Sequence, residues 1–88
     1  MSTDFWDIQV KIKERNRQRI RELEDSTGRI LTQADQDAAT LQSVYIQYRD
    51  GAITLAEFNL RMMEFMHLIN TFSYQMNEMY MLEEAVRS

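Results

Sequence analysis

Few residues of this 88-residue chain could do chemistry, since it has one histidine and no cysteine. Glu64 and His67 have the Glu-x-x-His spacing with which one helix presents two ligands to a di-iron centre. That centre needs a second such pair and two more glutamates, which only a dimer could supply here. We therefore interpret the pair as ordinary residues of a partly buried helix. Without cysteine, disulfides, thiolate nucleophiles and cysteine-ligated zinc are excluded.

Residues 46–57 resemble a calcium-binding loop in outline, with Gly51 and Glu57 at the sixth and twelfth places. The first and third places require oxygen ligands but hold Ile46 and Tyr48, so we expect no calcium site. The chain also has no Ser/His/Asp arrangement, no glycine-rich phosphate loop and no paired catalytic carboxylates. We expect a non-enzymatic protein without catalytic residues, metal ligands or cofactor.

Positive charge is concentrated in the first third of the chain. Residues 11–21 hold six basic residues and one acidic residue, whereas residues 31–88 hold three basic and eight acidic ones, within a net charge of −4. The run Glu14-Arg15-Asn16-Arg17 resembles the basic helix of basic helix-loop-helix factors. That resemblance implies base contacts by the glutamate and phosphate contacts by the arginines. The candidate residues for an anionic partner are Lys11, Lys13, Arg15, Arg17, Arg19 and Arg21.

Two departures separate this segment from that family. Gln18 stands where the next arginine is expected, and the helix that follows ends at Asp50-Gly51 and does not continue into a zipper. Because every second residue is basic, a helix divides the charges into two groups about 200° apart, unlike a single strip facing DNA. We expect these charges to pair mainly with acidic residues, and we keep a nucleic-acid-binding regulator as an alternative function.

The absence of proline and the presence of only two glycines predict an all-α fold. We predict one domain, 1–88, with helices over about 4–27, 33–49 and 55–86, forming an αα-hairpin plus a long C-terminal helix that oligomerisation completes as a bundle. Gly28 is expected to end the first helix, and Thr32 to cap the second; one helix continuous through Gly28 is the alternative. The apolar stripes of the first two helices are Phe5, Ile8, Ile12, Ile20, Leu23, with Asn16 in the gap, and Leu31, Ala34, Ala38, Leu41, Tyr45, Tyr48.

The third helix has the strongest pattern. Thr54 and Glu57 form a capping box, and apolar residues then repeat through four heptads, as in coiled coils. The two seam positions hold Leu55, Met62, Ile69, Met76 and Phe58, Phe65, Phe72, Met79, Val86. The opposite side is apolar as well, so we expect the helix to be buried on most sides.

Residues 41–63 are also similar to a short helical hairpin found at the C-terminus of many bacterial proteins. The matching features are Asp50-Gly51, Ile53-Thr54 and Glu57-Phe58. The resemblance implies a well-capped αα-hairpin and carries no function to this chain.

The predicted third helix spans roughly 45–50 Å, longer than the diameter of about 30 Å expected for a compact domain of this size. We therefore expect its apolar end to overhang the domain and to be covered by another chain. Asn16, if buried against its copy, would fix the register of such an interface. The predicted oligomer interface is Phe58, Met62, Phe65, Ile69, Phe72, Met76, Met79 and Tyr80.

These patterns favour a protein-binding module: a small adaptor, inhibitor or assembly factor that forms a homo-oligomer and binds another protein. A small acidic chain of this kind is typical of phage and mobile-element proteins. A third class is a self-assembling helical subunit of a secretion or virion structure. No apolar run is long enough to span a membrane, and the N-terminus lacks a secretory signal, so we expect a cytoplasmic location in a bacterium or host.

Overall fold

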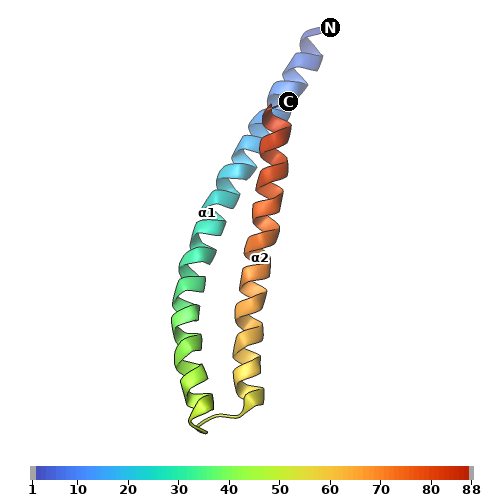
Figure 1. The fold of residues 1–88 in the computed structure, drawn as a ribbon. Coiled ribbons are helices and arrows are strands. Elements are labelled where there is room, and N and C mark those ends of the chain that lie inside the picture. The colour runs from blue at the N-terminus through green and yellow to red at the C-terminus, as the bar shows by residue number, and fades with distance from the viewer. Residues whose placement is uncertain (1, 88) are drawn as a thin grey trace.

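The computed structural model describes residues 2–87, with side chains from residue 4 onward, as a hairpin of two antiparallel helices (Figure 1). Helix α1 covers Ser2–Arg49 and helix α2 covers Leu55–Arg87. The described residues contain no strand. The all-α prediction is confirmed, but the three-helix bundle is wrong, because the first two predicted helices are one.

Helix α1 passes through Gly28 without a break. The residue has no positive φ, and a Cβ at this position would meet nothing within 4 Å. A glycine in a helix costs only about 1 kcal/mol relative to alanine, and the packing of Leu23 and Thr27 against α2 offsets that cost. Thr32 does not cap a helix, because its hydroxyl donates to the Gly28 carbonyl at 3.1 Å inside α1.

The connection between the helices confirms the stop and start signals. Gly51 has φ 84°, and its N–H donates to Tyr48 O at 3.0 Å. Ala52 N–H donates to Gln47 O at 2.8 Å, which completes a Schellman motif. Thr54 Oγ1 accepts the Glu57 N–H at 3.1 Å and caps α2.

The two helices meet along a heptad seam. Apart from Ser26, the α1 residues that lose solvent access recur at alternating steps of four and three, as in a coiled coil. They are Gln9, Lys13, Asn16, Ile20, Leu23, Thr27, Ile30, Ala34, Asp37, Leu41, Val44 and Tyr48. Their half-buried counterparts in α2 are Phe58, Phe65, Leu68, Phe72, Gln75, Met79, Leu82 and Val86.

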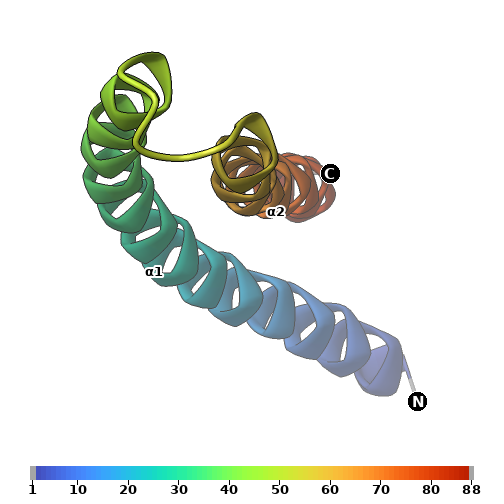
Figure 2. The ribbon, with the colours of Figure 1, turned by 90° about the horizontal axis from the view of Figure 1, so that it is seen from below.

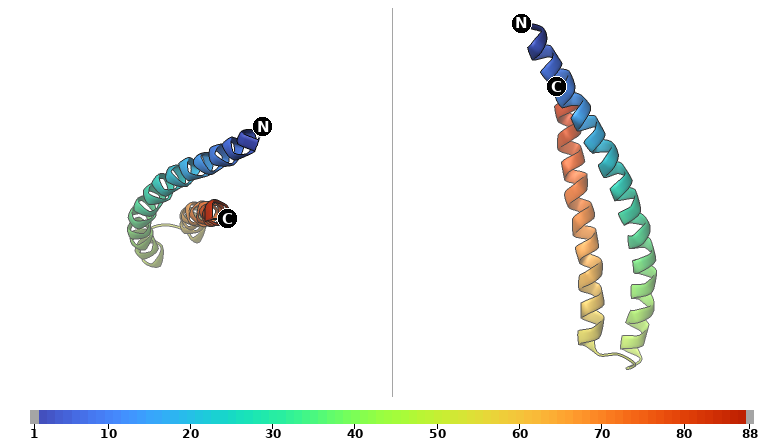
Figure 3. Two further views of the ribbon diagram at one scale, coloured as in Figure 1. Left: turned by 90° about the horizontal axis from the view of Figure 1, so that it is seen from above. Right: turned by 180° about the vertical axis from the view of Figure 1, so that it is seen from behind.

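The molecule is long and thin, with extents of 73 × 18 × 14 Å and a radius of gyration of 20.3 Å. The expected compact domain, with the C-terminal helix overhanging it, is therefore wrong. Helix α2 lies beside α1, and the longer α1 continues past the C-terminal end of α2 (Figures 1 and 3). Seen along its length, α1 follows a curve beside the straighter α2 (Figure 2). Neither helix combines the length and hydropathy of a membrane span.

Candidate interaction surface

The hairpin has a very small core. Leu23, Ala34 and Thr27 are the buried residues of the part for which burial is described, and the rest of the seam is half-buried. Two helices cannot enclose each other, because each covers only one side of its neighbour. Large apolar side chains consequently stay in water, including Trp6 at 66% exposure, Tyr74 at 76% and Met81 at 62%.

Polar side chains occupy one side of the seam, which we call the polar side. Here Arg19 Nε donates to Glu78 Oε2 at 2.9 Å, and Ser26 Oγ donates to Gln75 Oε1 at 2.8 Å. The hydrogen bond from Arg19 holds the pKa of Glu78 below its ordinary value, and the same bond raises the pKa of Arg19. The polar side comprises Arg19, Ser26, Gln33, Thr40 and Gln47 of α1, with Glu57, Glu64, Thr71 and Glu78 of α2.

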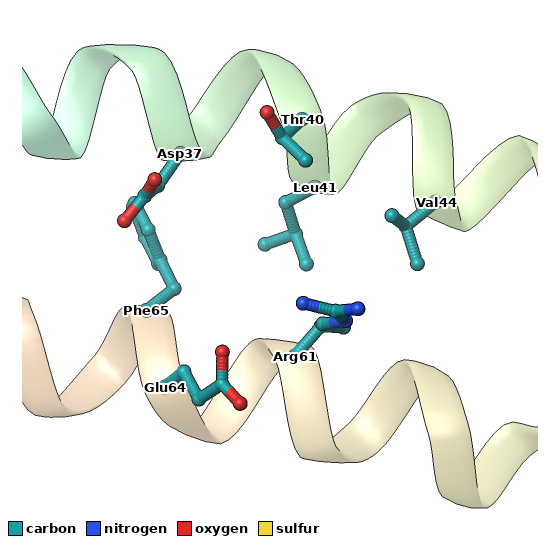
Figure 4. Close-up of a pocket in the computed structure, with 7 residues that line it drawn as sticks. All are labelled: Asp37, Thr40, Leu41, Val44, Arg61, Glu64 and Phe65. Carbon is teal, nitrogen blue, oxygen red and sulfur yellow. The ribbon is translucent and has the colours of Figure 1, made fainter.

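A small cavity of about 90 Å³ lies on the polar side toward the loop. Arg61 extends from α2 between the helices toward Leu41 and Val44, with Glu64 beside it, and Asp37 lies across from Phe65 (Figure 4). Charged side chains of both signs line the cavity, and it is partly open to solvent. It therefore offers no enclosed site for a small ligand.

The other side of the seam, which we call the apolar side, has a different character. Tyr45 packs edge-on to Phe58, with ring centroids 5.7 Å apart, beside a shallow depression that Ala38 and Phe65 also line. The residues beside the seam here, in the half nearer the loop, carry no formal charge. They are Leu31, Ala38 and Tyr45 of α1 with Met62 and Ile69 of α2, and further from the loop the same side carries Glu24 and Met76.

The predicted interface residues divide between the seam and the surface. Phe58, Phe65, Ile69, Phe72 and Met79 are half-buried in the hairpin, whereas Met62, Met76 and Tyr80 are exposed. The predicted partner positions of the α2 seam, Leu55, Met62 and Met76, are therefore replaced by Leu68, Gln75 and Leu82. The signal for them was present in the sequence, because each follows a phenylalanine or methionine of the seam by three residues.

The six basic residues do not gather on one face. Arg19 is paired across the hairpin with Glu78, and Lys13 lies on the seam, half-buried. The remaining four, Lys11, Arg15, Arg17 and Arg21, are exposed on different sides of α1.

The described residues contain no group of three His, Cys, Asp or Glu side chains that could hold a metal ion. Glu64 lies on the polar side of α2, and His67 is exposed one turn further on. Asp50 and Glu57 belong to the loop and the first turn of α2, and Asp50 lies 3.7 Å from Arg49. Comparisons of the chain with protein-family models, curated proteins and solved structures find no match.

Proposed function

We propose that this protein is a non-enzymatic interaction module that works as a homo-oligomer through the apolar surfaces of its helical hairpin. The main support for this proposal is the large solvent-exposed area of the single hairpin. A globular protein of this mass exposes about 5,400 Å², whereas the hairpin exposes 7023 Å². The hairpin therefore exposes about 1,600 Å² more than a globular protein of its mass. Two chains that buried this excess against each other would bury about 3,200 Å² in total, which lies in the range of obligate dimers.

Protein partners fit this surface better than nucleic acid does. Methionine, tyrosine and leucine side chains line the outer side of α2, namely Leu60, Met63, Met66, Tyr74, Tyr80 and Met81. Flexible methionine-rich surfaces adapt to other proteins. Nucleic acid needs a continuous basic strip, and here the basic residues are dispersed around α1 and Arg19 is already paired. An adaptor or assembly factor therefore remains the preferred role.

Sedimentation velocity between 1 and 100 μM tests this function. We expect a closed oligomer of the 10.5 kDa chain, whereas a monomer at all concentrations would contradict the proposal. Growth in length with concentration would instead support a filament subunit. A fluorescence anisotropy titration with duplex DNA at physiological salt tests the alternative, since binding that Arg15→Ala with Arg17→Ala removes would favour a nucleic-acid regulator.

A further inference from the structure

We propose that two copies of the hairpin join by their apolar sides, about a two-fold axis parallel to the helices, to form an antiparallel four-helix bundle. This inference rests on the proposed homo-oligomeric function and specifies its interface. Its first support is the difference between the two sides of the seam. The polar side holds the ion pair and the Ser26–Gln75 hydrogen bond, whereas the apolar side presents uncharged side chains beside the seam over 31–45 and 62–69.

The register of the hairpin indicates which residues would meet. Arg19 contacts Glu78, and Ser26 contacts Gln75. An α1 residue and an α2 residue therefore lie at about the same height along the hairpin when their two residue numbers add up to roughly 100. A two-fold axis parallel to the helices keeps every residue at its own level and places α1 opposite α2 of the second copy. Leu31 then faces Ile69, and Ala38 faces Met62, across the interface.

Charge complementarity supports a second copy as the occupant. Arg17 of α1 and Glu83 of α2 lie on the same side of the seam, beyond the apolar residues and away from the loop. Glu24 lies on this side between Arg17 and Leu31, and by the same register it faces Met76. Arg17 and Glu83 are level with each other, so each arginine meets a glutamate of the second copy and each glutamate an arginine. A self-complementary pattern of this kind is what a two-fold interface requires.

The N-terminal segment of α1 determines the direction of the axis. This segment runs past the end of α2 and exposes Phe5, Trp6, Ile8, Val10 and Ile12. With the axis parallel to the helices, both segments lie at one end of the dimer and can cover each other. With the axis perpendicular to the helices, they would project at opposite ends, and Arg17 would lie beyond the partner's loop without Glu83 opposite it.

A matched pair of variants tests the surface. Leu31→Glu places a charge on the apolar side at a position the hairpin leaves 53% exposed, and Gln33→Glu places it two residues away on the polar side. We expect Leu31→Glu to raise the dimer dissociation constant about a hundredfold or more, since each dimer would bury two unpaired carboxylates. Gln33→Glu should change it little. A Leu31→Glu protein that dimerises as the parent does would overturn the inference while leaving homo-oligomerisation intact.

The orientation is tested with a label outside the apolar side. The chain has no cysteine, so Asp7→Cys accepts a single nitroxide label, and electron-electron resonance measures the distance between the two labels of a dimer. With the parallel axis, we expect a separation within about 40 Å, since bundle helices lie 8–10 Å apart. A perpendicular axis through the apolar side near Ala38 would separate the labels by roughly 90 Å, and a result of that kind would overturn the inference. A labelled protein that is a monomer would overturn both the inference and the proposed function.

Discussion

The guanidinium of Arg19 in α1 spans the hairpin to the carboxylate of Glu78 in α2, with Nε 2.9 Å from Oε2 and Nη2 3.3 Å from Oε1. In the described part of the chain it is the one ion pair that joins the two helices. A bidentate arginine–carboxylate pair fixes direction as well as distance. The contact therefore helps to set the register of α2 along α1. The apolar contacts of the seam are not directional, so they specify this register less strictly.

Removal of the arginine should lower stability in a salt-dependent way. We expect Arg19→Ala to unfold at a lower temperature than Arg21→Ala, which truncates the same side chain at an exposed position without a partner across the hairpin. The double exchange Arg19→Glu with Glu78→Arg should recover part of the loss, because Glu22, which lies 3.6 Å from Arg19 Nη1, would then face a second carboxylate. Thermal unfolding followed by circular dichroism at low and at 1 M salt measures this, and an equal loss in both single variants would contradict it.

The same pair makes stability depend on pH in a defined direction. The pKa of Glu78 is lowered in the folded hairpin, chiefly by the hydrogen bond from Arg19. A carboxyl whose folded pKa is depressed stabilises the fold above its unfolded pKa, about 4.3 for glutamate, and loses that contribution as pH falls through the folded pKa. We expect the parent to exceed Glu78→Gln in unfolding temperature at pH 7 and to match it well below pH 4. A difference that persists at pH 2.5 would contradict this assignment.

The two glycines should respond to alanine in opposite ways. At Gly28 the backbone is helical and a Cβ meets nothing within 4 Å, so Gly28→Ala should stabilise by about 1 kcal/mol. At Gly51 there is also open space, but φ is +84°, and Gly51→Ala should destabilise by roughly 1–2 kcal/mol. Urea unfolding of both variants measures the two changes, and a destabilised Gly28→Ala protein would indicate that the helix does break there.

Local signals predicted the turn and the start of α2 well, because Gly51 and Thr54 act through their own backbone neighbours. The same kind of reasoning failed at Gly28, where no local interaction ends the helix and contacts with a distant segment keep it continuous. The α1 seam was also partly missed. Phe5, Ile8 and Ile12 follow an apolar period, yet the polar Gln9, Lys13 and Asn16 lie on the side that faces α2. Which of the two stripes of α1 is covered depends on how α2 packs against it. The sequence of α1 alone does not contain that information.

The small core makes Leu23 unusually important. It is 1% exposed and is the most deeply buried large side chain in the described part of the chain. We expect Leu23→Ala to destabilise by about 2–4 kcal/mol through lost burial and a cavity. Leu60→Ala, at a position 58% exposed on the outer side of α2, should change stability by less than about 0.5 kcal/mol. Chemical denaturation of both variants at equal concentration makes the comparison, and similar losses would place the core elsewhere.

The polar residues on the α1 seam should make the N-terminal end of the hairpin the first part to open. Lys13 and Asn16 lie beside a shallow groove that Ala85 of α2 also lines, and they replace apolar residues where the helices meet. Partial burial of polar side chains adds little free energy of folding. This end of the hairpin therefore contributes less to stability than the region around Leu23. We expect the amides of 10–18 and 80–87 to exchange with deuterium faster than those of 20–34. Asn16→Leu should add roughly 1 kcal/mol of seam packing and slow exchange at both helix ends, whereas unchanged exchange in that variant would show that the ends open for another reason.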